Sequence, residues 1–387
     1  MSNTLTNVMH KILARSLTVL RETCLMPQLV NTGYSLDAKT KGNTVDVPSS
    51  VAATIYDITA SQTPRTPTDH TQGLVQVTLD KWKGSNFHLT DQERTQINKD
   101  EHFIPKQMGE CVRVIANQVN TDILSVYTGI YGYVGTAGTT PFSNSTDRTA
   151  TKDATLTVAK LNDQLCPKTG RVAVIDTTAE AEATALPQFS HAEKAASANV
   201  LNTASLGNKY NIDWYSENAI GSHTAGTITT GLAVKASTVH AVGVKSVVCT
   251  TAASTGACAL LEGDIVLFAG DTQTYVLTAA ATQASAATDV TLAIEPALKV
   301  ATAGSEAVTV KATHVVNLAF NREAIALATA PFENDLNPNP SVFMRDPVTG
   351  LVLRLEIVRQ NKQTMWELDI LYGVKLIRPE FACRLAG

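Results

Sequence analysis

The stretch from Phe103 to Val134 constrains the fold more than any other part of the chain. Apolar residues recur in it at every third or fourth position, namely Ile104, Met108, Val112, Ile115, Val119, Ile123, Val126 and Ile130. This spacing places them along one stripe of an α-helix. Pro105 suits the first turn, and we expect the glycine-rich segment that begins at Gly129 to end the helix. At 1.5 Å per residue, some two dozen residues would span about 36 Å, which is the width of a small domain. A helix of this length is expected to act as a scaffold for the rest of the chain.

The face opposite this stripe is polar. It carries Lys106, Glu110, Arg113, Asn117 and Asn120. Because an amphipathic helix buries only its apolar side, we expect these residues to face solvent or a neighbouring subunit.

The composition favours a sheet-rich structural protein. The chain has 387 residues, enough for two or three domains with cores of their own. Its formal net charge of −4 argues against a dedicated nucleic-acid binder, which usually has a strong basic excess. Aromatic residues make up only 5% of the chain, so the composition does not indicate a stacking surface.

The cysteines do not form a recognisable disulfide or metal-binding pattern. They are Cys24, Cys111, Cys166, Cys249, Cys258 and Cys383. We expect buried thiols in a protein made in a reducing cytoplasm, with a contact of Cys249 and Cys258 across a hairpin as the alternative. No apolar run reaches the 18 residues that would indicate a membrane span, so we expect none.

The N-terminus predicts an amphipathic helix over residues 1–26 that ends at Pro27. It has no continuous apolar core and no cleavage site, so we do not interpret it as a signal peptide. Its apolar stripe must be buried, either on the same domain or on a neighbouring copy.

A two-stranded arm is predicted next. Thr44 to Val47 and Val51 to Ile58 form one side, and Leu74 to Leu79 forms the other. The segment between them, Thr59 to Gly73, has no large apolar residue with which to build a core. Because such a hairpin is marginal alone in water, we expect it to lie across another subunit; the alternative is an unstructured surface loop.

Beyond the arm, the pattern predicts a compact α/β lobe. Thr90 to Glu93 matches a capping box that begins a short helix before the long one. The lobe then contains a helix, a buried strand, a helix that is bent or broken at Pro187, and another strand. These elements are Leu156 to Leu165, Arg171 to Ile175, Thr178 to Lys194 and Tyr210 to Tyr215.

The composition changes at Gly221. From Ser222 to His314 there is no Trp and no Arg, and short strand patterns alternate with turns. The strands are expected at Val239 to Val248, Asp264 to Phe268, Tyr275 to Ala279, Asp289 to Ile294 and Ala307 to Val310. This pattern predicts an inserted small barrel or sandwich, which we expect to stabilise the subunit or its contacts.

The lobe is expected to resume at Val315 to Phe320, followed by a helix from Arg322 to Thr329. Strands at Ser341 to Arg345 and Leu351 to Val358 then flank a turn from Asp346 to Gly350, with Pro as its second residue and Gly as its last. From Trp366 to Leu376 apolar and charged residues alternate. We expect an antiparallel sheet whose apolar face packs on the long helix.

No catalytic, cofactor-binding or metal-binding residue is predicted. The eight histidines are far apart, and none has a metal-ligand spacing with another His or Cys. His191 beside Ser190 and Glu193 lacks a nucleophile elbow, and Asp176 after a strand is explained equally well as a helix N-cap. The glycines from Gly129 to Gly138 lack the Lys-Ser or Lys-Thr of a phosphate loop.

Lys81, Trp82 and Lys83 form a small basic and aromatic patch. Contact with nucleic acid is one interpretation of such a patch, but we favour packing beneath the arm.

The order of these elements resembles the major capsid proteins of tailed bacteriophages, which have the Johnson fold. It is most similar to the podophage coat subgroup, which carries an inserted β-barrel domain. The residues that carry the resemblance are Phe103-Ile104-Pro105, Asp122-Ile123-Leu124 with Tyr127, Tyr131 to Gly135, Leu260 to Ile265, and Leu292 to Ala297.

The resemblance implies an α+β fold with an N-arm, an E-loop, a P-domain with a spine helix, an A-domain and the inserted barrel. The implied boundaries are 1–42 for the N-terminal helical arm, 43–88 for the E-loop, 89–134 for the P-domain with the spine helix, 135–221 and 315–335 for the two parts of the A-domain, 222–314 for the barrel and 336–387 for the C-terminal sheet of the P-domain.

The implied function is structural: pentamers and hexamers of the chain would tile an icosahedral shell around the double-stranded DNA genome of a tailed phage. Expected partners are other copies of the chain, a scaffolding protein, a portal, DNA bound without sequence preference and a decoration protein, with no membrane. The protein would be found in the virion, and in the host cytoplasm during assembly. The alternatives are an encapsulin-like compartment shell and a hydrolase with an appended β-module, in which His191 would be required.

Overall fold

The computed structural model describes residues 6–33, 44–49, 55, 57–58, 73–97, 103–143, 151–190, 206–228, 231–251, 258–283, 289–332 and 341–387. The chain divides into two compact units. The first unit comprises 1–19, 32–115 and 326–377, and the second comprises 20–31, 116–325 and 378–387.

The first unit is built on an antiparallel sheet with the order β19-β22-β21-β20, in which β3 also pairs with β22. These strands are β3 (Lys81–Thr90), β19 (Ile325–Thr329), β20 (Ser341–Arg345), β21 (Val352–Gln360) and β22 (Gln363–Leu376). Alternate residues of β22, namely Trp366, Leu368, Ile370 and Tyr372, are buried. This confirms the alternation predicted for the C-terminal sheet.

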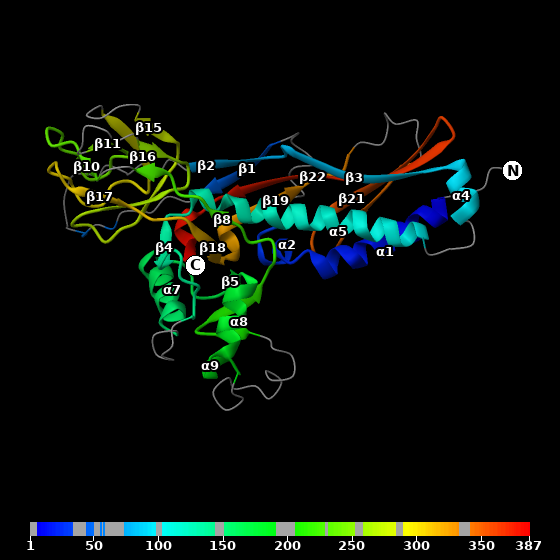
Figure 1. Ribbon diagram of the computed structural model, residues 1–387, viewed down its shortest axis with the longest axis horizontal. Helices are drawn as coiled ribbons and strands as arrows, with labels where there is room; N and C mark the ends of the chain where they lie inside the picture. Colours follow the sequence, from blue (N-terminus) through cyan, green and yellow to red (C-terminus); the bar gives the residue numbers. More distant parts are fainter. Residues whose placement is uncertain are drawn as a thin grey trace. The chain divides into compact units, whose positions relative to one another are not determined.

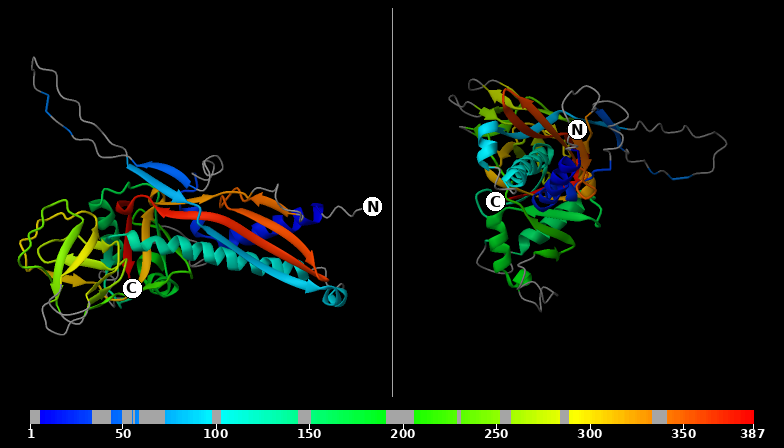
Figure 2. Two further views of the ribbon diagram at one scale, coloured as in Figure 1. Left: turned by 90° about the horizontal axis from the view of Figure 1, so that it is seen from above. Right: turned by 90° about the vertical axis from the view of Figure 1, so that its right-hand side faces the viewer.

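Two helices lie along one face of this sheet: α1 (Thr6–Thr23) and, up to Ile115, α5 (Phe103–Leu124) (Figures 1 and 2). The stripe residues Met108, Val112 and Ile115 of α5 are buried, as predicted. A side chain built on Gly109 would lie 4.0 Å from Val19, so the two helices run close together. The N-terminal helix therefore packs on its own chain.

The two strands of the arm are β1 (Thr44–Ser49) and β2 (Gly73–Thr78), paired antiparallel as predicted. Val45, Val47, Val77 and Leu79 form a buried cluster with alanines of β19. Most of Val51 to Ile58, and the segment from Thr59 to Gln72, lie outside the described residues.

The capping box is also confirmed, because Thr90 and Glu93 exchange hydrogen bonds at the start of α4 (Asp91–Ile97).

The second unit contains a mixed sheet with the order β4-β23-β18-β5-β7-β6. The strands are β4 (Gly132–Gly135), β5 (Arg171–Ile175), β6 (Gly207–Lys209), β7 (Ile212–Ser216), β18 (His314–Asn321) and β23 (Ala382–Ala386). Helices α7 (Lys152–Asp163), α8 (Thr177–Ala185) and α9 (Pro187–Ser190) cover one face. The core on that face includes Phe142, Phe189 and Trp214, whose rings meet edge to face. The buried strand β5 and the helix break at Pro187 were both predicted.

The inserted segment forms a closed barrel in the order β10-β11-β16-β14-β13-β17. These are β10 (Leu232–Val234), β11 (Ser246–Thr251), β13 (Ile265–Phe268), β14 (Tyr275–Leu277), β16 (Val290–Glu295) and β17 (Ala307–Val310). A small sheet of β15 (Ala281–Gln283), β12 (Cys258–Leu260) and β9 (Thr227–Ile228) accompanies it. The sequence predicted a barrel or a sandwich, and the structure is a barrel.

Four local predictions are wrong: the extent of the long helix, the exposure of Asn120, the helix at Arg322 to Thr329 and the start of a strand at Val239. The α-helix ends at Leu124, and a 3₁₀ turn (Ser125–Gly129) and strand β4 follow where more helix was expected. Gly132 serves close strand packing, because a side chain there would lie 2.8 Å from the Ala382 carbonyl oxygen. Asn120 is buried, since it accepts a hydrogen bond from the Met26 amide and donates one to Glu217.

The third and fourth errors concern strands. Residues Arg322 to Thr329 form a 3₁₀ turn (Arg322–Ala324) and strand β19 instead of a helix. The alanines of β19 pack against the apolar residues of the arm strands β1 and β2. This packing outweighs the high helix propensity of alanine. Strand β11 begins only at Ser246, and both Val239 and Val242 are exposed. Cys249 and Cys258 lie in strands of different sheets, so they do not face each other across a hairpin.

We predict that Gly373→Ala strongly destabilises the first unit. Its Cβ would lie 2.0 Å from the Thr78 carbonyl oxygen, so β22 and β2 would have to separate. The expected loss is about 3 kcal/mol or more of the free energy of unfolding, measured by urea denaturation. Gly221→Ala is the control, because nothing lies within 4 Å of its added Cβ. Equal stabilities of the two variants would contradict the prediction.

Candidate functional site

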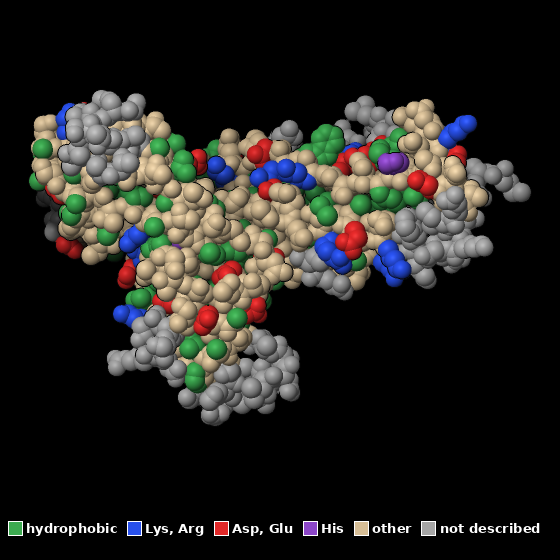
Figure 3. Space-filling model, viewed as in Figure 1, with side chains coloured by type: hydrophobic (Ala, Val, Ile, Leu, Met, Phe, Trp, Pro, Cys, Tyr) green, Lys and Arg blue, Asp and Glu red, His purple; other side chains and the backbone are tan. Residues whose placement is uncertain are grey.

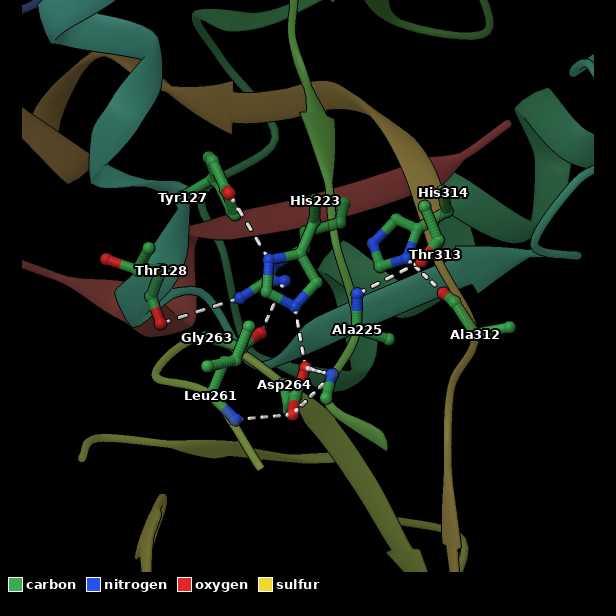
Figure 4. Close-up of polar contacts among 12 residues, drawn as sticks. Tyr127, Thr128, His223, Ala225, Leu261, Gly263, Asp264, Ala312, Thr313 and His314 are labelled. Atoms are coloured by element: carbon green, nitrogen blue, oxygen red, sulfur yellow. Dashed lines mark hydrogen bonds and ion pairs between the residues drawn. The ribbon is translucent and has the colours of Figure 1, made fainter. Parts of the chain in front are cut away.

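The inserted segment leaves and rejoins the second unit at adjacent positions. The short strand β8 (Ser222–His223) pairs antiparallel with the start of β18, in the register His314↔His223 and Val315↔Ser222. The two histidine rings are therefore neighbours, with centroids 5.5 Å apart. A polar cluster is built around them. We call it the joint and define it as Tyr127, His223, Asp264, His314 and Arg384; Figure 4 labels the first four.

Asp264 lies at the centre of the joint, at the end of the turn before β13. Its carboxylate is fully buried and accepts hydrogen bonds from the Leu261 amide at 2.8 Å and the Gly226 amide at 3.1 Å. His223 Nε2 lies 2.8 Å from its Oδ1. The carboxylate thus connects the first residues of the insertion to the barrel itself (Figure 4).

Tyr127 contacts the other side of the His223 ring. It comes from the 3₁₀ turn after α5, and its hydroxyl lies 3.2 Å from His223 Nδ1. Because the Asp264 carboxylate can only accept, Nε2–H of His223 donates to it, and Nδ1 lies within hydrogen-bond distance of the Tyr127 hydroxyl. Burial raises the pKa of Tyr127, so this hydroxyl keeps its proton at neutral pH.

Arg384 brings a positive charge into the joint from β23. It is fully buried, donates to the Gly263 carbonyl oxygen at 2.8 Å and lies 5.0 Å from the centroid of the Tyr127 ring. Burial lowers the pKa of Arg384 to about 10, which still leaves it charged at neutral pH. The Asp264 carboxylate supplies the opposite charge that a buried guanidinium requires.

Gly263 makes the turn of the joint possible. Its φ is +90°, a left-handed conformation that favours glycine. An added Cβ would lie 3.2 Å from Thr128 Cγ2 and 3.3 Å from His223 Cε1. The glycine therefore lets the barrel turn approach both the 3₁₀ turn and the first histidine.

His314 is buried with one ring nitrogen satisfied. Its Nδ1–H donates to the Ala312 carbonyl oxygen at 2.8 Å, and Nε2 has no hydrogen-bond partner among the described residues. Burial lowers the pKa of His314 to about 4, because the charged ring would lose its hydration next to Arg384. His314 is therefore neutral at physiological pH.

The Tyr127–His223–Asp264 arrangement has the order of a proton relay, but it is not accessible to a substrate. His223 is 4% exposed and Asp264 is not exposed. A buried and largely hydrogen-bonded cluster of this kind fixes the positions of chain segments. We interpret it as the structural connection between the barrel and the mixed sheet.

The structure places the residues singled out in the sequence as follows. Asp176 is a helix N-cap that accepts from the Thr178 and Ala179 amides. Trp82 is 64% exposed; its ring lies tilted against Phe332 with centroids 5.3 Å apart, and its Nε1–H donates to Asp369 of the sheet. His191 and Glu193 lie outside the described residues.

In the described ranges, no group of three or more His, Cys, Asp or Glu side chains is arranged to hold a metal ion. The helices in those ranges include none with the length and apolar character needed to cross a membrane.

The joint was not predicted from the sequence. Its histidines are far apart along the chain, and only the long-range pairing of β8 with β18 brings them together. One signal was present: His223 and His314 stand at the two ends of the segment that lacks Trp and Arg. Residues at adjacent ends of an insertion are candidates for mutual contact.

We predict that Asp264→Asn destabilises the protein by about 3 kcal/mol, because it leaves Arg384 buried without its countercharge and turns an amide donor toward the Gly226 amide. Chemical denaturation measures this loss. Asp289→Asn makes the same change in the exposed Lys235–Asp289 ion pair and should cost less than about 1 kcal/mol. A loss at Asp264 no greater than that of the control would show that the joint does not stabilise the fold.

We also predict an acid-dependent loss of stability from His314. Its pKa is about 4 in the folded protein and 6.5 in the unfolded chain. Between these values only the unfolded chain takes up the proton, so stability falls as the pH is lowered from 6.5 toward 4, by about 3 kcal/mol in total. Denaturation measured across this range should show a shallower pH dependence for His314→Gln. An unchanged slope in that variant would contradict the assignment.

The family model described as phage capsid protein matches residues 71–263, about half of the chain. No curated protein matches the sequence significantly. A solved chain from Mycobacterium phage Che8 has a TM-score of 0.52 and 14% identity, covering 92% of this chain and 88% of that one. This similarity shows that the fold is shared.

Other solved structures align over a similar share of the chain with lower scores. The capsid of cyanophage P-SCSP1u has a TM-score of 0.47 and 12% identity over 92% of this chain and 84% of that one. The virus-like particle from Pyrococcus furiosus has a TM-score of 0.41 and 6% identity over 97% of both chains. The family match and the shared fold together identify a structural protein of the virion: the chain belongs to the phage capsid protein family and is a major capsid protein that forms an icosahedral shell.

Proposed function

We propose that this chain assembles as pentamers and hexamers into a shell that encloses the double-stranded DNA genome of a tailed phage, and that it belongs to the podophage subgroup with an inserted barrel. The observation that carries the proposal is the capsid family match, which extends from the arm through the long helix into the barrel. The closed barrel between β8 and β18 supports the subgroup.

We assign the parts of the shell subunit as the sequence predicted them. Residues 43–88 are the E-loop, and 89–134 with 336–387 are the P-domain. Residues 135–221 with 315–335 are the A-domain, which carries the barrel, and 1–42 are the N-terminal arm. Three strands cross these boundaries: β19 pairs in the sheet of the first unit, whereas β4 and β23 pair in the mixed sheet of the second unit. Ile55 and Ile58 of the arm are almost fully exposed, and burying two such side chains on a neighbouring copy would stabilise the contact.

The surface charge suits a container for DNA. On the face shown in Figure 3, basic and acidic side chains are interspersed without a broad basic area. Tight binding to packaged DNA would need many Lys and Arg contacts to phosphate. We propose that the shell contacts DNA weakly and without sequence preference. We also propose that the chain binds a scaffolding protein and a portal during assembly in the host cytoplasm, and that a decoration protein binds the finished shell. We propose no enzymatic activity.

The test is electron microscopy of the purified protein, expressed alone and with its scaffolding protein. We expect closed icosahedral particles with fivefold and sixfold capsomers. A chain that stays monomeric at high concentration in both preparations would overturn the proposal. In particles from infected cells, packaged DNA and a portal would support the phage shell, whereas an enclosed enzyme would support the encapsulin-like alternative.

A further inference from the structure

A pocket of about 330 Å³ opens beside β4 in the second unit. Its walls come from three places: β4, helix α7 and two loops of the barrel. The side chains that define it are Tyr133, Val134, Leu156, Lys160, Asp163 and Lys311. None of these residues belongs to the joint.

The pocket lies at the free edge of the mixed sheet. Tyr133 and Val134 are consecutive in β4, so their side chains point to opposite faces of the sheet. Tyr133 packs with Ile265 of the barrel, whereas Val134 belongs to the core beneath α7. One pocket can reach both residues only at an edge, and among the described residues β4 is the terminal strand of the sheet, with β23 as its neighbour.

The side chains around this edge favour an anionic ligand. Lys160 and Lys311 contribute two positive charges against the one negative charge of Asp163. Among the described residues, neither lysine forms an ion pair; Lys311 Nζ lies 5.4 Å from the centroid of the Tyr133 ring. Leu156 is 41% exposed and adds an apolar wall.

A free strand edge offers main-chain hydrogen bonds to an added extended segment, and side-chain pockets provide specificity. We propose that this pocket binds a short extended segment of a second copy of this chain, which adds a strand to β4 and places an Asp or Glu side chain between Lys160 and Lys311. The occupant rests on the proposed function, because shell assembly brings copies of the chain together. The excess of acidic residues, 35 against 31 basic ones, supplies the complementary charge.

Zero-length coupling with a carbodiimide tests this contact, because it joins an amine to a carboxylate only where the two touch. Particles are assembled from an equal mixture of ¹⁴N and ¹⁵N subunits, coupled and analysed by mass spectrometry. We expect amide links between Lys160 or Lys311 and an acidic residue, with mixed isotope composition, in particles and not in unassembled subunits. Links confined to one copy, such as Lys160 to Asp163, or no links at these lysines, would overturn the inference.

Charge reversal provides an independent measurement. We expect Lys160→Glu with Lys311→Glu to raise the subunit concentration needed for half-maximal assembly at least about tenfold, while the circular dichroism spectrum is unchanged. The control is Lys168→Glu with Lys299→Glu, which changes two exposed lysines outside the pocket and should assemble as the wild type does. Equal assembly of both double variants would reject the pocket as a contact. Failure of the wild type to assemble would instead reject the proposed function.

Discussion

The second unit depends on a topological constraint: a barrel inserted into a lobe must begin and end at neighbouring points of that lobe. Pairing of β8 with β18 meets this constraint with backbone hydrogen bonds, and it brings His223 and His314 together. The barrel turn at Gly263 and the strand β23 then close around the two histidines. Segments that are far apart along the chain therefore share one buried polar cluster.

Burying charge in this way is costly unless each group is satisfied. Asp264 and Arg384 compensate each other in charge, and backbone amides and carbonyls take up much of their hydrogen-bonding capacity. Arg171, which is also buried, is satisfied differently, since it donates to Asn162 and to the Cys166 and Pro167 carbonyl oxygens. Polar networks of this kind specify one arrangement of the segments, because displacing a segment leaves a buried charge unpaired. For a subunit of a shell, a defined orientation of the barrel on its own lobe determines which surfaces are available to neighbours.

The two faces of the mixed sheet have different roles. One face carries α7, α8 and an apolar core, and the other carries the barrel and the joint. The edge strand β4 contributes Val134 to one face and Tyr133 to the other. The edge pocket therefore differs from the joint in kind: the joint is closed and internal, whereas the pocket is open and its lysines form no ion pairs among the described residues.

The sequence by itself determined what local periodicity and composition encode. The stripe of α5, the alternation in β22, the capping box at Thr90 and the insertion of a β-rich segment were all predicted from spacing alone. The order of these elements then indicated the family.

Tertiary structure decided what depends on partners remote in the sequence. Residues Arg322 to Thr329 contain good helix formers, yet the arm and β22 make them a strand. Asn120 is polar, yet Met26 and Glu217 allow its burial. Gly132 and Gly135 admit the close approach of β23. The joint needed the fold most of all, because a histidine becomes part of a network only when strand pairing places a carboxylate within hydrogen-bond distance.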